Sequence, residues 1–170
     1  MIKYLKKSKP EIEKIEDDRK VRTSVEEILS KIKKDGDDAI RFYSEKFDNY
    51  SPNSFRLSDT QIKECLTKVS SKDLEDIKFA QTQIKNFAEI QKDSMKDVES
   101  ETLPGVILGH KNIPVESVGC YVPGGKFPMI ASAHMSVITA SVAGVERIIA
   151  SAPPQNGSPH PAIVAAMHLG

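Results

Sequence analysis

Apolar residues recur at helical spacing through the first hundred residues of the chain. Thr23 and Glu26 have the spacing of a capping box and predict the start of a first helix, which Gly36 would end in a left-handed conformation. Ser58 and Gln61 predict the start of another helix in the same way. Four stripes of mostly apolar residues follow from this spacing: Val25, Ile28, Leu29 and Ile32; Ile40, Tyr43 and Phe47; Ile62, Leu66 and Val69; and Leu74, Ile77, Ile84, Phe87 and the polar Gln91. We interpret these stripes as core-facing surfaces rather than ligand sites.

From about residue 101 the pattern changes to short apolar runs separated by glycine and proline. Gly144 is placed to end one helix, and Pro161 suits the first turn of the last one. The expected strands are residues 106–108, 115–122 and 147–152, the first two joined as a hairpin through His110-Lys111-Asn112, and the expected helices are residues 132–143 and 162–169. A strand, a glycine loop, a helix, a strand and a helix in this order are typical of a parallel α/β sheet.

The composition divides the chain at the same point. Residues 101–170 hold eight of the nine glycines and eight of the ten prolines but only six charged residues. We therefore expect an α/β fold, with a helical amino-terminal region at 1–100 and the first part of a Rossmann-like nucleotide-binding domain at 101–170. Two parallel strands and a hairpin make an incomplete parallel sheet. We expect a chain that is cut short at Gly170, and the alternative is a small complete α+β domain.

Charge and hydropathy give no indication of a nucleic-acid or membrane partner. Twenty-four basic residues balance twenty-four acidic ones. The longest apolar stretch, residues 129–143, is too short and too often interrupted by polar residues to span a bilayer, and the start of the chain lacks the apolar segment of a signal peptide. Cys65 and Cys120 match no zinc or redox spacing and are interpreted as reduced thiols. These features predict a cytoplasmic protein.

The segment from Gly119 to Lys126 is the strongest candidate for a functional site. Gly124 and Gly125 follow an expected strand and precede an expected helix, where backbone N–H groups can approach an anion. Tyr121 offers a ring face and a hydroxyl group to a ligand, and Lys126 adds a positive charge. The spacing matches neither the dinucleotide fingerprint with three glycines nor a Walker loop, and Pro-Gly-Gly is also a common structural turn. From the residues alone, a ligand site and a structural turn remain equally open.

The four histidines and the carboxylates of the second part form no catalytic set. We interpret His134 as a packed or hydrogen-bonded residue and His110 as a hairpin residue. His160 and His168 are eight residues apart, whereas a metal-binding pair on a helix needs three or four. No nucleophile, base and orienting residue can be assembled from the chain. The prediction is therefore that this chain contains no catalytic and no metal-binding residue.

Several segments together resemble the histidinol dehydrogenase superfamily. The resemblance runs from about Val21 to Gly170 and rests on the following segments: Gly36-Asp37-Asp38-Ala39, Lys46-Phe47-Asp48, Leu103-Pro104-Gly105-Val106, Val118-Gly119-Cys120-Tyr121-Val122-Pro123-Gly124-Gly125, Ala140 to Val145, and Ala152-Pro153-Pro154. The run from Tyr121 to Gly125 with the helix and the double proline is the most specific part.

The resemblance implies a homodimeric enzyme that uses zinc and two NAD molecules to oxidise a primary alcohol to a carboxylate through a bound aldehyde. It implies that Tyr121 contacts NAD, and Gly124 and Gly125 are the other expected cofactor-binding residues. The family's zinc ligands, catalytic pair and remaining NAD contacts correspond to segments beyond residue 170.

One segment bears on the substrate. The run from Lys126 to Ser136 differs from the usual histidinol dehydrogenase pattern and resembles the branch related to sulfopropanediol 3-dehydrogenase, which implies dihydroxypropanesulfonate rather than histidinol as the alcohol. Two other classes of function remain open at this point. One is a non-catalytic module that binds a nucleotide or an anion, and the other is a helical interaction domain.

Overall fold

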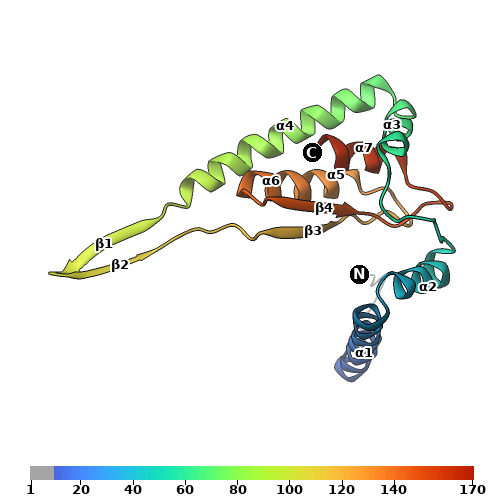
Figure 1. The fold of residues 1–170 in the computed structure, drawn as a ribbon, viewed down its shortest axis with the longest axis horizontal. Coiled ribbons are helices and arrows are strands. Elements are labelled where there is room, and N and C mark those ends of the chain that lie inside the picture. Colours follow the sequence, from blue (N-terminus) through green and yellow to red (C-terminus); the bar gives the residue numbers. More distant parts are fainter. Residues whose placement is uncertain (1–9) are drawn as a thin grey trace, which may run out of the picture. The chain divides into compact units, whose positions relative to one another are not determined.

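The structure is a computed structural model that describes residues 10–170 and divides the chain into two compact units. The first unit ends at Ser51, and the second runs from Pro52 to Gly170. The first contains α1 (Glu11–Asp35) and α2 (Asp37–Asp48), and the second contains all the strands (Figure 1). The division predicted at residue 100 lies inside a strand of the second unit. None of the described helices combines the length and apolar character needed to cross a bilayer.

The first helix begins earlier than its apparent capping box predicts. Thr23 lies in the middle of α1, where its hydroxyl group donates to the carbonyl of Arg19 at 3.0 Å, so the prediction of a helix start at Thr23 is wrong. The reason is that a Thr-x-x-Glu pattern also fits the interior of a helix, where threonine bonds the preceding turn instead. The helix ends at Gly36 as predicted, and the N–H of Gly36 donates to the carbonyl of Ile32. Its φ of 57° is positive, but its ψ of −132° differs from the left-handed helical conformation that was expected, because α2 begins directly after it.

The helices α3 (Asp59–Thr67) and α4 (Ser71–Ser94) begin the second unit. The predicted capping box is confirmed at α3, because the Ser58 hydroxyl accepts from the N–H of Gln61 and the Gln61 side chain accepts from the N–H of Ser58. The predicted face of α4 is only partly correct. Ile77 is buried, but Phe87 is 62% exposed and Gln91 is exposed, because the buried side of the helix runs through Gln81 and Ala88.

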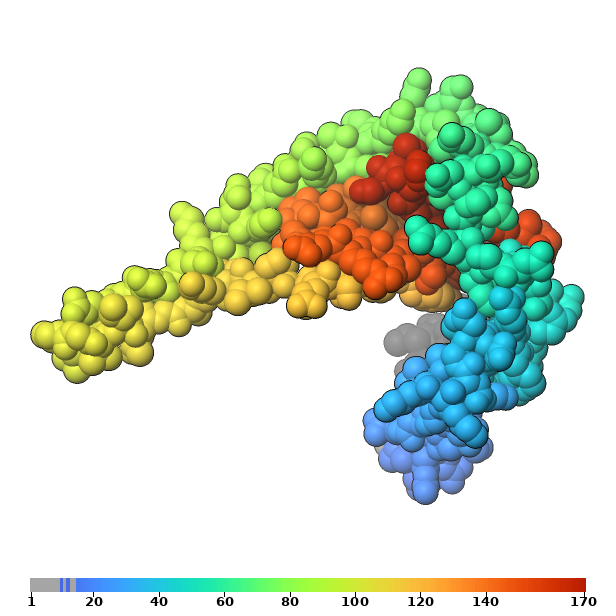
Figure 2. All heavy atoms as spheres, in the orientation of Figure 1, coloured from blue at the N-terminus to red at the C-terminus, as the bar shows by residue number. Residues whose placement is uncertain are grey.

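The hairpin forms between other segments than the sequence predicts. β1 (Val98–Leu103) pairs antiparallel with β2 (Val106–His110) around Pro104-Gly105, with Gly105 at a φ of 81°. The expected pairing of residues 106–108 with 115–122 is therefore wrong. A proline followed by a glycine of positive φ is the stronger turn signal. Both strands are exposed along their whole length and extend beyond the rest of this unit (Figures 1 and 2).

The second sheet contains two parallel strands joined by a helix, as expected. β3 (Ser117–Tyr121) pairs with β4 (Arg147–Ser151) in parallel, with Tyr121 opposite Ser151. The connecting helix consists of α5 (Ile130–Ala133), a π-helical segment η1 (His134–Ile138) and α6 (Thr139–Ala143). Gly144 ends it in the left-handed conformation (φ 93°, ψ 23°), which confirms that prediction. The last helix, α7 (Pro161–Leu169), begins with Pro161 as predicted.

The core of the second unit lies where α4, β3, α5 and α7 meet. Its buried members are Ile77, Val122, Ala133, Ile163, Ala165 and Ala166. Val122 and Ile163 are the largest fully buried side chains. Val122 directly follows β3, so the loop that carries the candidate site is anchored in this core.

Candidate functional site

The glycine loop (residues 122–129) leaves the sheet at the carboxyl ends of β3 and β4. The N–H of Val122 donates to the carbonyl of Ser151 at 2.7 Å and so extends the pairing of the two strands by one residue. The carbonyl of Pro123 accepts from the N–H of Met129 at 3.2 Å and closes the loop before α5 begins. The carboxyl edge of parallel strands is where open α/β sheets bind ligands.

Tyr121 is the last residue of β3 and lies at this edge. Tyr121 is 65% exposed, although its backbone pairs with Ser151 in the sheet. An aromatic ring that is fixed at its backbone and open to solvent offers a face for stacking and a hydroxyl group for hydrogen bonding. The position of Tyr121 is thus compatible with the ligand contact that the sequence predicts.

The two glycines of the loop have different surroundings. A Cβ atom at Gly124 would lie 2.8 Å from Cδ1 of Ile163, and Gly124 is buried. At Gly125, which is exposed, the nearest atom to a Cβ would be Cγ of Pro153 at 4.0 Å. Gly124 therefore allows the loop to pack closely on α7 without displacing Ile163. Gly125, beside the exposed Lys126, leaves an open stretch of backbone that a ligand can approach.

A buried polar contact that the sequence did not predict lies behind this loop. His134 is only 4% exposed, and its Nδ1 lies 3.3 Å from Nε2 of Gln81, which is 6% exposed. Burial lowers the pKa of His134 below its ordinary value. His134 is thus a packed, hydrogen-bonded residue, as the sequence predicts. Gln81 was missed, although its place four residues after Ile77 on the same helix was a signal for burial.

The described residues do not form a zinc site. Among residues 10–170, no group of three or more His, Cys, Asp or Glu side chains is placed to hold a metal ion. Cys65 and Cys120 are buried and unpaired. His110 ends β2, where its ring lies 3.1 Å from the carbonyl of Lys96, so it belongs to the β1–β2 hairpin and not to the turn where the sequence places it.

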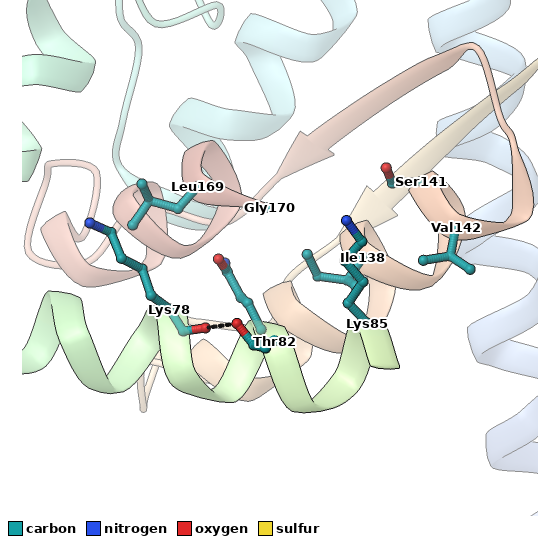
Figure 3. Close-up of a pocket in the computed structure, with 9 residues that line it drawn as sticks. Lys78, Thr82, Lys85, Ile138, Ser141, Val142, Leu169 and Gly170 are labelled. Atoms are coloured by element: carbon teal, nitrogen blue, oxygen red, sulfur yellow. Dashed lines mark hydrogen bonds between the residues drawn. The ribbon is translucent and has the colours of Figure 1, made fainter. Parts of the chain in front are cut away.

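A separate pocket of about 280 Å³ lies at the other end of α7 (Figure 3). Its lining residues come from α4, from the helix 130–143 and from the end of the chain: Lys78, Gln81, Thr82, Lys85, Ile138, Ser141, Val142, Leu169 and Gly170. The Thr82 hydroxyl donates to the carbonyl of Lys78 at 2.9 Å. The pocket borders Leu169 and Gly170, whereas the glycine loop contacts Ile163 in the first turn of α7, so the two sites are distinct.

Comparison with known proteins identifies the family. A family model described as histidinol dehydrogenase matches residues 12–170. The chain belongs to the histidinol dehydrogenase family. The resemblance drawn from the glycine loop and its neighbours is thereby confirmed. The fold agrees as well, since the crystal structure of histidinol dehydrogenase from Elizabethkingia anophelis superposes with a TM-score of 0.80 at 28% identity, covering 98% of this chain and 36% of that one.

Relatives with different names match most of the chain. A histidinol dehydrogenase homolog of Shouchella clausii is 50% identical over 99% of this chain, and the sulfopropanediol 3-dehydrogenase of Ruegeria pomeroyi is 45% identical over 99%. The histidinol dehydrogenase of Methanosarcina barkeri is 38% identical over 86%. The chain covers 40%, 38% and 34% of these relatives, respectively, and so spans between about a third and two fifths of their length.

Proposed function

We propose that this chain supplies part of the NAD site of a dehydrogenase that oxidises a primary alcohol to a carboxylate through an aldehyde. When bound, NAD⁺ would supply the hydride acceptor, and oxidation of one alcohol to a carboxylate would need two NAD⁺ and one water. The observation that carries the proposal is the glycine loop at the carboxyl ends of β3 and β4, within a chain of this family.

The residues of the loop fit parts of a dinucleotide. The exposed ring of Tyr121 can stack on a base or a nicotinamide, and its hydroxyl group can donate to the ligand. The backbone at Gly125 is open to a phosphate group, and the charge of Lys126 favours an anion there. Gly124 contributes indirectly, because its packing on Ile163 sets the path of the loop.

The favoured substrate is dihydroxypropanesulfonate, which would be oxidised to sulfolactate, and histidinol is the second candidate. The relative named for sulfopropanediol is 45% identical over 99% of this chain, whereas the histidinol dehydrogenase of Methanosarcina barkeri is 38% identical over 86%. The run from Lys126 to Ser136 supports the same choice.

The remaining parts of the proposal concern the whole enzyme. We place zinc binding and catalysis on segments outside residues 1–170, because the chain covers only 40%, 38% and 34% of the relatives named above. We also propose that the whole enzyme is a cytoplasmic homodimer. The chain on its own is expected to bind NAD weakly and to form no NADH.

A chimeric enzyme tests this function directly. Residues 1–170 would replace the matching segment of the Ruegeria pomeroyi sulfopropanediol 3-dehydrogenase, which is 45% identical. We expect NADH formation, followed by absorbance, with dihydroxypropanesulfonate and little with histidinol. A well-folded chimera that loses turnover but retains NAD binding would contradict the proposed substrate. Loss of NAD binding would contradict the role of the loop, and NADH formation by the 170-residue chain alone would contradict the placement of catalysis elsewhere.

A further inference from the structure

The side-chain amide of Gln81 connects three elements of the second unit. Its Nε2 lies 2.9 Å from the carbonyl oxygen of Ala166 in α7 and 3.3 Å from Nδ1 of His134 in η1, while Gln81 itself belongs to α4. We call this arrangement the Gln81 clamp: the amide group of Gln81 with the acceptor atoms of Ala166 and His134. Gln81 and His134 are the two buried polar residues of the described chain.

The contacts determine the orientation of the amide and the tautomer of the histidine. A carbonyl oxygen can only accept, so the atom 2.9 Å from the Ala166 oxygen must be the NH₂ group of Gln81. The same NH₂ group points its second hydrogen towards Nδ1 of His134, which must then be the unprotonated nitrogen. His134 is therefore neutral, with its proton on Nε2.

The clamp lies next to the residues that support the glycine loop. Val122 of the loop packs in one cluster with Ile77, Ala133 and Ala166. Ile77 is one turn before Gln81, Ala133 directly precedes His134, and Ala166 is itself an acceptor of the clamp. Gly124 rests on Ile163 in the first turn of α7, whereas Ala166 lies one turn later in the same helix.

Protonation of His134 is incompatible with this geometry. An added proton on Nδ1 would face the NH₂ group of Gln81, so two donors would oppose each other. Rotating the amide would supply an acceptor to His134 but would place its oxygen opposite the carbonyl oxygen of Ala166. One buried hydrogen bond is lost in either case, and an unsatisfied buried polar group is costly.

No neighbouring charge offsets this conflict. The elements packed against η1 carry titratable groups on α4, β3 and α7, whereas α5 and α6 carry none. These groups are Lys72, Asp73, Glu75, Asp76, Lys78, Lys85, Glu89, Lys92 and Asp93 on α4, Cys120 and Tyr121 on β3, and His168 on α7. Those nearest to Gln81 along α4 are Lys78 and Lys85, and none of the carboxylates contributes to the pKa of His134. Burial is the sole cause of the lowered pKa of His134. A protonated ring would thus have no carboxylate to stabilise it.

We propose that Gln81 and His134 are positioning residues for the glycine loop, which they hold in place while His134 is neutral and release when His134 is protonated. The role of the loop in binding a dinucleotide rests on the proposed function. The coupling between His134 and the loop does not, and it can be measured without any ligand.

Nuclear magnetic resonance of the 170-residue chain between pH 8 and pH 5 tests the proposal. At pH 8 the nitrogen shifts of His134 should show the proton on Nε2. On lowering the pH, the amide signals of Gly124 and Gly125 should move with the same midpoint as the His134 ring. A proton on Nδ1 at pH 8, or loop amides that stay in place while His134 titrates, would overturn the proposal.

Two variants and a control separate coupling from general loss of structure. In Gln81→Glu a carboxylate faces Nδ1, so the midpoint of His134 and of the loop amides should rise together by about one pH unit, a tenfold change in the protonation ratio. In His134→Leu the loop amides should lose this transition. His168→Gln removes an exposed histidine of α7 and should leave the transition of the loop amides unchanged. An unchanged midpoint in Gln81→Glu would show that the two side chains are not coupled.

Discussion

Gly124 and Ile163 are in such close contact that a side chain at position 124 would force Ile163 to move. A Cβ atom there would be 2.8 Å from Cδ1 of Ile163, whereas a Cβ atom at Gly125 would be 4.0 Å from its nearest neighbour, in Pro153. Ile163 is 1% exposed, so its side chain has little space to move aside. The two adjacent glycines thus meet different requirements. Gly124 allows the loop to pack closely on α7, and Gly125 leaves the backbone open to solvent.

Replacing each glycine by alanine should reveal this difference. Gly124→Ala should lower the free energy of unfolding by about 1–3 kcal/mol, because it overpacks a filled core. Gly125→Ala should change it by less than about 0.5 kcal/mol, since the site is open. Urea unfolding followed by circular dichroism measures both values. Equal losses in the two variants would mean that the contact with Ile163 does not set the requirement for glycine at position 124.

The two capping patterns of the chain provide a second test. Ser58→Ala removes the hydroxyl group that accepts from the N–H of Gln61 and should destabilise the second unit by about 1 kcal/mol. Thr23→Ala changes the same kind of pattern inside α1 and should stabilise that helix by a few tenths of a kcal/mol, because alanine is the better helix former. Hydrogen exchange of the α1 and α3 amides measures each effect. A loss of protection in α1 for Thr23→Ala would contradict its place within the helix.

Features that depend on local chemistry were predictable from the sequence. Ser58 begins α3, Gly144 ends α6 and Pro161 begins α7, since each needs only its own side chain and the adjacent backbone. The parallel pair β3–β4 followed from apolar runs on either side of a helix. The strand β1 was missed because four of its six residues are polar or charged and all are exposed, so the strand lacks the apolar alternation that indicates a strand.

The candidate site was predictable only in part, because its support depends on contacts that are distant in sequence. Tyr121 and Gly125 were identified from the strand–loop pattern and lie at the predicted edge. The reason for glycine at position 124 depends on Ile163, 39 positions later along the chain. The contact of Gln81 with His134 joins residues 53 positions apart and involves a π-helical turn, for which the sequence gives no clear signal.

Tyr121 should contribute to cofactor affinity. In the chimeric enzyme proposed above, Tyr121→Ala should raise KM for NAD about tenfold with a smaller effect on kcat, since aromatic stacking on a base contributes about 1–3 kcal/mol. Tyr121→Phe keeps the ring and should recover most of that loss. Steady-state kinetics with NAD as the varied substrate measures both values. An unchanged KM in Tyr121→Ala would remove the cofactor role from this residue.

Lys92 should stabilise the helix that follows the loop. Its Nζ donates to the carbonyl of Val142 at 2.7 Å, in the last turn of α6, where a positive charge interacts favourably with the helix dipole. Lys92→Met should lower the free energy of unfolding by about 0.3–1 kcal/mol, and the loss should shrink at high salt. Lys85→Met is a matched control, because the pair of Lys85 with Glu89 is a solvent-exposed contact of 3.9 Å that contributes little. Equal effects of both variants would argue against a specific role of Lys92.

His134 should make the second unit less stable as the pH falls. Burial lowers the pKa of His134 in the folded state below its ordinary value of 6.5. Below pH 6.5 His134 takes up a proton in the unfolded chain, whereas in the folded chain it does so only at a lower pH. The stabilisation is therefore fully present above pH 6.5 and declines as the pH falls towards the lowered pKa. One such proton contributes at most about 1.4 kcal/mol per pH unit to the free energy of unfolding.

Urea unfolding at pH 7.5, 6.5, 5.5 and 5.0 should show a steeper decline in the free energy of unfolding for the unmodified chain than for His134→Leu. The other three histidines are common to both proteins, so their contribution cancels in the comparison. Parallel curves would mean that His134 is protonated as readily in the folded state as in the unfolded one, and would contradict the neutral histidine inferred from its contact with Gln81.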